Sequence, residues 1–141
     1  FIGTVKAAGA SALLGLFINT GDRFDACLKG MRVTHIGDGE CTCELPVEKS
    51  LCNAYGTLHG GASCTIVDVV GTIALLTVAP TKPGVSLEIN TSFVSAAKEG
   101  SVVVATGKVL KAGKRVAFTT VDLRVKDTGA LVVTGRHTKA L

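Results

Sequence analysis

Residues 58–78 read LHGGASCTIVDVVGTIALLTV, and apolar side chains fall on nearly every side of a helix drawn through them. A helix without a polar face is normally enclosed by other structure. Its most apolar part, residues 65–79, is interrupted by Asp68 and is shorter than the ~20 apolar residues that span a bilayer. We therefore expect a long central helix over residues 58–78, buried inside a domain.

The segments around this helix alternate between apolar and polar residues, which predicts strands. The expected strands are residues 31–36, 41–47, 85–93, 102–110, 116–125 and 131–138. In the third of these, period two places Val85, Leu87, Ile89, Thr91 and Phe93 on one face and Ser86, Glu88, Asn90 and Ser92 on the other. The short connections, including the turn at residues 37–39, predict antiparallel hairpins.

This order of elements predicts an α+β fold in which a strongly curved antiparallel sheet wraps around the central helix. Apolar residues at helical spacing over residues 5–17 predict an additional N-terminal helix. The 141 residues fit a single domain, 1–141, and no linker or internal repeat divides them.

Composition excludes several classes of function. The net charge of +4 is too weak and dispersed to indicate nucleic-acid binding, although it suits an anionic ligand such as a phosphate ester. Aromatic residues make up 4% with no Trp, which argues against a base-stacking surface. The five Cys form no repeated pattern and no second pair for zinc, so we expect free, buried or half-buried thiols. Free thiols fit a reducing compartment, cytoplasmic or mitochondrial.

Residues 53–68, which read NAYGTLHGGASCTIVD, carry the candidate chemistry. A polar loop enters the long helix at Gly60, where backbone N–H groups lack partners and the helix dipole is positive. An oxygen that gains negative charge can be held there, as in an oxyanion hole. The alternative is that Gly60 and Gly61 only allow tight packing of the helix on the sheet.

Asp68 is the one acidic residue in an apolar helix. A buried carboxylate must be paired, hydrogen-bonded or protonated, and its pKa is shifted by those surroundings. It is therefore a candidate general base or nucleophile, with a structural Asp bonded to a nearby hydroxyl as the alternative.

Gly60 and Asp68 are too far apart to act together from one helix. Eight residues separate them, or about 12 Å along a helix axis, whereas both groups must lie within a few ångströms of one reacting carbon. The simplest solution is a site shared by two subunits, with Gly60 from one and Asp68 from the other. This predicts an obligate homodimer.

Three further polar residues are candidates. Asn53 has an amide that can donate to a carbonyl oxygen, or it can cap its own loop. We expect His59 to fix the loop, with a catalytic acid as the alternative. Ser86 would orient a water or the carboxylate, unless it is an ordinary solvent-facing strand residue.

Basic residues gather at or near strand ends and can meet the phosphates of a nucleotide-bearing ligand, or can simply be solvated. They are Lys98, Lys108, Lys111, Lys114 and Arg115. Spacing alone indicates no role for Arg136 or His137.

The ordered set of motifs resembles the hotdog-fold acyl-CoA thioesterases of the phenylacetyl-CoA type. The resemblance covers roughly residues 31–141. Its motifs are Asn-Ala-x-Gly-Thr-Leu-His-Gly-Gly at 53–61 with Asp68 behind it, Pro-Gly-Val-Ser at 83–86, Leu-Lys-Ala-Gly-Lys at 110–114, Ala-Phe-Thr-Thr-Val-Asp-Leu at 117–123 and Gly-Arg-His-Thr-Lys at 135–139.

The resemblance implies hydrolysis of medium- to long-chain fatty acyl-CoA to a free fatty acid and coenzyme A, by dimers that assemble into tetramers. No metal or separate cofactor is implied, because coenzyme A is part of the substrate. Asp68 would be the base or nucleophile, the Gly60 N–H and Asn53 amide would polarise the thioester, His59 would support the loop, and Ser86 would position the water or Asp68. Coenzyme A would contact Phe93, Ser95, Ala96, Lys98, Lys111, Gly113, Lys114 and Arg115.

Two positions depart from the family pattern, Ala140 in place of a basic or imidazole side chain and Tyr55 in place of an aliphatic one. Two other functions remain as alternatives. One is a non-catalytic acyl-CoA-binding or sensing protein, against which the presence of Asp68 counts. The other is an enoyl-CoA hydratase, for which His59 and Asp68 have unsuitable spacing on one helix.

Overall fold

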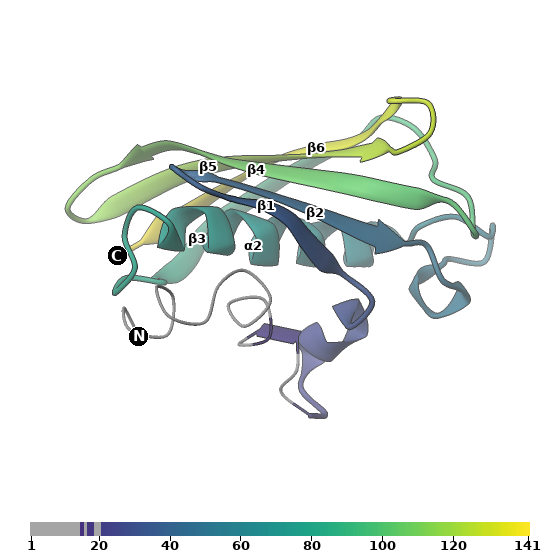
Figure 1. Ribbon diagram of the computed structural model, residues 1–141, viewed down its shortest axis with the longest axis horizontal. Helices are drawn as coiled ribbons and strands as arrows, with labels where there is room; N and C mark the ends of the chain where they lie inside the picture. The colour runs from purple at the N-terminus through teal and green to yellow at the C-terminus, as the bar shows by residue number, and fades with distance from the viewer. Residues whose placement is uncertain (1–14, 16, 19–20) are drawn as a thin grey trace.

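A computed structural model describes residues 15, 17, 18 and 21–141. The helix predicted over residues 5–17 lies outside the described residues, apart from residues 15 and 17. The described elements follow in chain order (Figure 1): the 3-10 helix η1 (Phe24–Leu28), β1 (Arg32–Gly37), β2 (Glu40–Pro46), η2 (Lys49–Leu51), α2 (Gly60–Leu76), β3 (Val85–Phe93), β4 (Val102–Ala112), β5 (Val116–Val125) and β6 (Leu131–Ala140).

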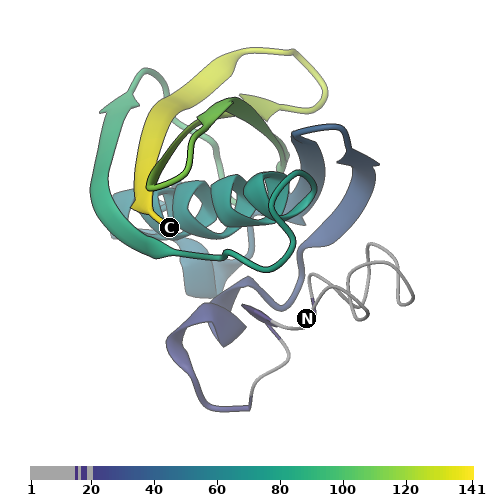
Figure 2. The same ribbon diagram turned by 90° about the vertical axis from the view of Figure 1, so that its left-hand side faces the viewer.

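Six strands form one sheet in the order β1-β2-β4-β5-β6-β3, and every neighbouring pair is antiparallel. The sheet curls around α2, which lies along its concave side (Figure 2). The predicted curved sheet and central helix are therefore confirmed. The hairpin predicted across residues 98–100 is wrong, because β3 lies at the far edge of the sheet and pairs with β6, whereas β4 pairs with β2 and β5.

Packing, rather than helix propensity, holds α2 together. The helix is rich in Val, Ile and Thr, whose branched side chains favour strands. Ile66, Val70 and Ile73 are fully buried against the sheet, in the core that runs through the described residues. None of the helices in the described part of the chain is long and apolar enough to cross a membrane.

A β-bulge in β3 corrects the face predicted for Ser86. The register runs Ser86↔Lys139 and then Glu88↔Thr138, so Leu87 is an extra residue on the β3 side. Lys139 and His137 are buried under the sheet, and Ser86 lies on their face, together with Ile89. The strict alternation predicted for this strand is wrong at its start, because the bulge turns Ser86 inward.

β3 is an open, apolar edge of the sheet. Every residue in it except Thr91 is exposed. Val85 is 68% exposed, Leu87 60% and Phe93 59%. A long edge strand with unpaired backbone groups and apolar side chains is a template for pairing with another strand.

The close approach of α2 to β4 occurs at Gly107, and its effect on stability can be tested there. A Cβ there would lie 3.0 Å from both the Val70 carbonyl oxygen and its side chain. We expect Gly107→Ala to lower the free energy of unfolding by about 1–3 kcal/mol, because overpacking pushes the helix off the sheet. Chemical denaturation measures this change.

Gly30→Ala is the matched control. A Cβ at Gly30 meets its nearest neighbours at an ordinary 3.7 Å. We expect the control to change stability by less than about 0.5 kcal/mol. Equal effects of the two substitutions would show that helix–sheet contact at Gly107 is not the constraint.

Candidate functional site

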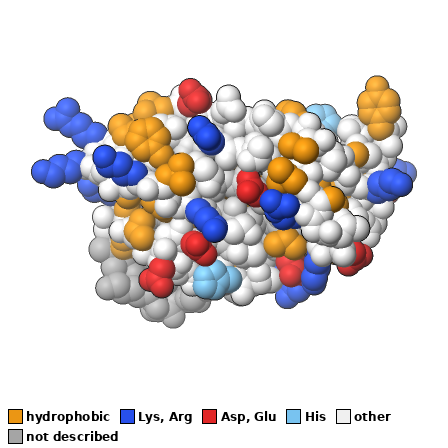
Figure 3. Space-filling model, turned by 90° about the horizontal axis from the view of Figure 1, so that it is seen from above, with side chains coloured by type: hydrophobic (Ala, Val, Ile, Leu, Met, Phe, Trp, Pro, Cys, Tyr) orange, Lys and Arg blue, Asp and Glu red, His pale blue; other side chains and the backbone are white. Residues whose placement is uncertain are grey.

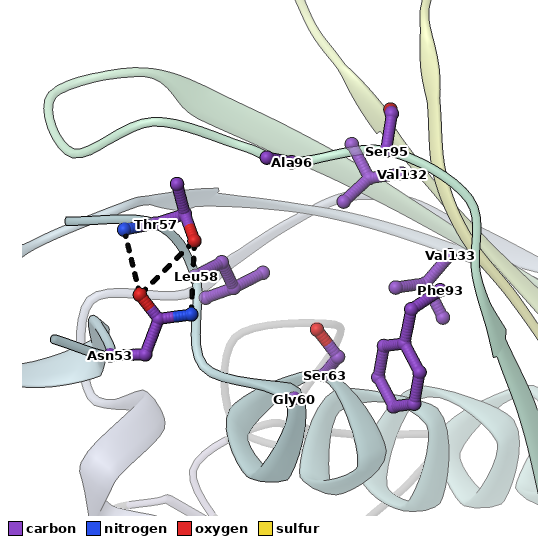
Figure 4. Close-up of a pocket in the computed structure, with 10 residues that line it drawn as sticks. All are labelled: Asn53, Thr57, Leu58, Gly60, Ser63, Phe93, Ser95, Ala96, Val132 and Val133. Atoms are coloured by element: carbon purple, nitrogen blue, oxygen red, sulfur yellow. Dashed lines mark hydrogen bonds between the residues drawn. The ribbon is translucent and has the colours of Figure 1, made fainter. Parts of the chain in front are cut away.

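A pocket of about 320 Å³ opens at the N-terminal end of α2. It is lined by Asn53, Thr57, Leu58, Gly60, Ser63, Phe93, Ser95, Ala96, Val132 and Val133 (Figure 4). Five of these are residues that the sequence singled out: Asn53, Gly60, Phe93, Ser95 and Ala96. Three segments far apart in the chain, within residues 53–63, 93–96 and 132–133, thus meet in one pocket.

The first turn of α2 presents an unused donor to this pocket. Within the described residues, no acceptor is bonded to the N–H of Gly60. The Phe93 ring lies over this turn (Figure 4), and a Cβ on Gly60 would approach the ring to 3.2 Å. A free N–H at a helix N-terminus, partly screened from water by an aromatic ring, suits an oxygen that gains negative charge.

His59 is the N-cap of α2. Its Nδ1 accepts a hydrogen bond from the Gly61 N–H at 2.8 Å. In the neutral ring, Nε2 therefore carries the proton. The exposed ring does not line the main pocket.

The Asn53 side chain organises the loop before the helix. Its Oδ1 accepts from the N–H groups of Tyr55 and Thr57, at 3.0 and 3.1 Å. Its Nδ2 donates to Thr57 Oγ1 at 3.0 Å. An amide nitrogen has two hydrogens, so one remains for a ligand in the pocket. The Tyr55 ring is 91% exposed at the loop tip and does not line the pocket.

Asp68 lies two turns further along α2 and does not line the pocket. Its side chain is 43% exposed in the single chain, so the expectation of a buried carboxylate is wrong for one subunit. Partial burial raises the pKa of Asp68, and the charge of Lys139 opposes that rise. Asp25 of η1 lies close enough to Asp68 for its own pKa to be raised, mainly by burial and further by the Asp68 charge.

A polar cluster between α2, β3 and β6 brings together the predicted residues Asp68 and Ser86 with His137 and Lys139, which the sequence analysis did not single out. His137 is fully buried, and its Nε2 lies 2.6 Å from Ser86 Oγ and 3.7 Å from Asp68 Oδ1. Burial, helped by the Lys139 charge, lowers the pKa of His137 to about 4. The ring is therefore neutral near pH 7, and its contact with Asp68 is neither an ion pair nor a short hydrogen bond.

Lys139 completes this cluster. It is 4% exposed, and its Nζ donates to Thr72 Oγ1 at 2.7 Å. Burial lowers the pKa of Lys139, and Asp68 opposes that shift. The alternation of β6 could have indicated that both side chains are buried. His137 and Lys139 follow Val133 and Gly135 at every second position, on the inward face of the strand.

The predicted basic residues lie in separate places in one chain, with Lys98 at one end of β4 and three others at its far end. The backbone of Lys98 pairs with Thr57 beside the pocket. Lys111, Lys114 and Arg115 are exposed at the β4–β5 turn, and β4 has 11 residues, or about 35 Å. Figure 3 shows Lys and Arg side chains projecting from that end of the molecule. Lys108 Nζ pairs with Glu40 at 3.7 Å.

A second pocket, of about 250 Å³, lies on the other flank of the helix entrance. Its lining includes Phe24, Leu51, Ala62, His59 and two of the thiols, Cys27 and Cys52. All five Cys are free, as predicted, although Cys27 is exposed rather than buried. Burial raises the pKa of the Cys27 and Cys52 thiols, so both stay protonated near neutral pH.

Comparisons with known proteins agree with one another. A family model described as thioesterase superfamily matches residues 55–132. Human acyl-coenzyme A thioesterase 13 is 46% identical over 118 residues, which are 84% of each chain. The crystal structure of zebra fish thioesterase superfamily member 2 superposes with a TM-score of 0.87 at 39% identity, covering 92% of this chain and 93% of that one. Mouse thioesterase superfamily member 2 gives 0.83 at 40% identity, covering 92% of each chain.

The helix cap gives a prediction for His59. We expect His59→Ala to lower the free energy of unfolding by about 1 kcal/mol, because the Gly61 N–H loses its acceptor. His59→Asn should retain most of that stability, since Asn is a favoured N-cap. Thermal or chemical denaturation compares the two. Equal losses in both variants would contradict a capping role.

Proposed function

The chain belongs to the thioesterase superfamily, and we propose that it hydrolyses acyl-coenzyme A thioesters to a free acid and coenzyme A. Its curved sheet and central helix are the hotdog fold of that superfamily. The similarity to acyl-coenzyme A thioesterase 13 supports the substrate class. The observation that carries the proposal is the unused Gly60 N–H at a helix N-terminus, facing a pocket with a second donor at Asn53.

In the proposed reaction, the thioester carbonyl oxygen accepts hydrogen bonds from the Gly60 N–H and the Asn53 amide. Asp68, as the carboxylate, takes a proton from water, and the water oxygen bonds to the carbonyl carbon. The two donors stabilise the charge that develops on the carbonyl oxygen. The carbon–sulfur bond then breaks, and the coenzyme A thiolate leaves and takes up a proton.

The site would be completed by a second copy of the chain. Gly60, Cys64 and Asp68 form the half-exposed stripe of α2. Cys64 Sγ lies 3.5 Å from Thr91 Oγ1, so this stripe faces the β3 edge. Pairing of β3 with the same strand of a partner would cover the apolar edge and set Asp68 of one subunit opposite Gly60 of the other.

The contacts along β3 suggest the register of that pairing. Phe93 lies over Gly60, whereas Ser86 lies within the Asp68 cluster. In a symmetric pair, the Phe93 end of one β3 strand lies opposite the Ser86 end of the other. The two-fold axis must then pass near the midpoint between these two residues, at about Asn90. The same rotation would bring the partner's β4–β5 turn, with its three basic residues, toward the pocket end. Assembly of such dimers into a tetramer remains an expectation from the resemblance.

We propose fatty acyl groups of medium to long chain as substrates. Leu58, Phe93, Val132 and Val133 give the main pocket apolar walls. A non-catalytic acyl-CoA sensor is the second candidate, because the same pocket can bind without turnover.

Asp68→Asn tests the function directly. We expect turnover to fall by about 10²–10⁴-fold, the usual contribution of a general base. Thiol release from short, long and aromatic acyl-CoAs measures it, with a no-substrate blank for the protein's own five Cys. In the wild type, kcat/KM should fall as pH falls through the raised pKa of Asp68, because the base is lost on protonation.

Asp122→Asn is the matched control. Asp122 accepts from Thr134 Oγ1 on the outer face of the sheet, away from α2, so its loss should leave turnover unchanged. Tight binding of acyl-CoA without thiol release by the wild type would favour the sensor. Normal turnover by a folded Asp68→Asn variant would remove Asp68 from the mechanism.

Cysteine cross-linking tests the shared site. With a two-fold axis at Asn90, we expect Asn90→Cys to form a disulfide-linked dimer, because a residue on the axis lies opposite itself. Glu88→Cys and Ser92→Cys should not link when either variant is used alone. Each position lies two residues from the axis, in opposite directions on the two strands, so identical thiols are about 13 Å apart. A mixture of those two should link.

Non-reducing electrophoresis measures the products, and the wild-type chain controls for its own thiols. A monomeric mass in solution, or equal cross-linking at all three positions, would reject this register.

A further inference from the structure

The two nitrogens of the His137 ring have different surroundings. Nε2 lies 2.6 Å from Ser86 Oγ, a short hydrogen bond. Nδ1 is buried and has no hydrogen-bond partner among the described residues. It lies next to Gly71, where a Cβ would come within 3.4 Å of it. The nearby Thr119 hydroxyl donates its proton to the His137 carbonyl oxygen at 3.0 Å, so it cannot donate to Nδ1, and its oxygen makes no hydrogen bond with Nδ1.

These surroundings select one tautomer of the neutral ring. A proton on Nδ1 would leave a buried N–H without an acceptor, which is rarer in proteins than an unsatisfied acceptor. A proton on Nε2 instead lies between the Ser86 oxygen and the Asp68 carboxylate, 3.7 Å away. The negative charge favours the positive end of an N–H dipole at that position.

We propose that His137 is a positioning residue whose Nε2–H donates to Ser86 Oγ, which leaves the Ser86 hydroxyl proton to hold the water that Asp68 activates. The tautomer does not depend on the proposed function, but the role in positioning water does. The water would lie between Ser86 Oγ and the Asp68 carboxylate, which are 2.6 and 3.7 Å from the same ring nitrogen. The water would accept from Ser86 and donate to Asp68, with a lone pair free to attack.

The same tautomer argues against a nucleophilic serine. In a Ser-His-Asp triad the carboxylate holds Nδ1–H while Nε2 takes the serine proton. Here Asp68 and Ser86 both face Nε2, and Nδ1 has no hydrogen-bond partner in the part of the chain that the structure describes. With its proton already on Nε2, His137 cannot accept one from Ser86.

The charged groups around the ring are consistent with a neutral His137 during turnover. Lys139 on β6 and burial both lower the pKa of His137, to about 4. Asp68 on α2 faces it at 3.7 Å, and Asp25 on η1 faces Asp68 in turn. Because the pKa of His137 is lowered to about 4, the ring gains a proton only when the pH falls that far, well below neutrality.

Nuclear magnetic resonance reads the tautomer directly, without any substrate. The full chain contains three His, so long-range proton–nitrogen correlations of the labelled protein should resolve them, and His137→Gln identifies the His137 signals. We expect the Nε2–H form, with no change between pH 5 and pH 8 because the ring titrates near 4. An Nδ1–H form, or titration within that range, would overturn the proposal.

A matched pair of variants tests the role of the donor. The amide nitrogen of His137→Gln can take the place of Nε2, whereas that of His137→Asn can take the place of Nδ1. We expect Gln to retain kcat within about threefold and Asn to lower it roughly 10- to 100-fold with little change in KM, because the water loses its orientation. In a Ser86→Ala background, the two variants should be equal.

The outcomes are distinguishable. Absence of thioesterase activity in the wild type would defeat the proposed function and the water-positioning role, while the resonance data would still decide the tautomer. Equal kcat in folded Gln and Asn variants, with the wild type active, would overturn the positioning role alone. If the Asn variant fails to fold, the wild-type resonance experiment still decides between donor and acceptor at Nε2.

Discussion

The enclosure of α2 by the sheet is the constraint on which the rest of the molecule depends. A helix this rich in branched residues is held by its surroundings, so the sheet must approach it closely. Gly71, Gly107 and Gly135 allow that approach, since a Cβ on any of them would lie 3.0 Å or less from a neighbouring side chain. The sheet leaves the first turn of the helix open, and there the Gly60 N–H meets the pocket.

The enclosure is incomplete along one side, and that side carries the chemistry. The outer strand β3 leaves a half-exposed stripe on α2 that includes Gly60 and Asp68. The apolar strand edge is unfavourable when it is exposed to water. The half-buried carboxylate is unfavourable because it has lost part of its hydration. A partner strand would relieve the edge and bring the separated halves of the site together, so assembly and catalysis would share one cause.

Sequence patterns were sufficient for a sheet wrapped around a helix because those signals are local and strong, but they did not give the position of β3, which pairs with β6 instead of β4. An apolar helix and regularly alternating strands leave little choice but a sheet wrapped around a helix. Among the pocket residues, Asn53 and Gly60 followed from the loop and helix entrance, whereas Phe93, Ser95 and Ala96 came only from the family resemblance. Ser86 was placed on the wrong face because one bulge residue, Leu87, shifts the register, and alternation alone cannot locate a bulge. His137 and Lys139 were missed because their partners lie across the fold, on α2 and β3.

Those missed residues explain how a carboxylate can remain useful in an apolar setting. Burial raises the pKa of Asp68, and a partner subunit would bury it further. Lys139 acts in the opposite direction, and its own buried ammonium is held by the Thr72 hydroxyl, whose proton goes to the Asp68 carbonyl oxygen at 2.8 Å. The charge of Lys139 thus favours the ionised form of Asp68 against the effect of burial, and no ion pair joins the two side chains within the described residues. The carboxylate oxygens stay free for water, which a tight salt bridge would not allow.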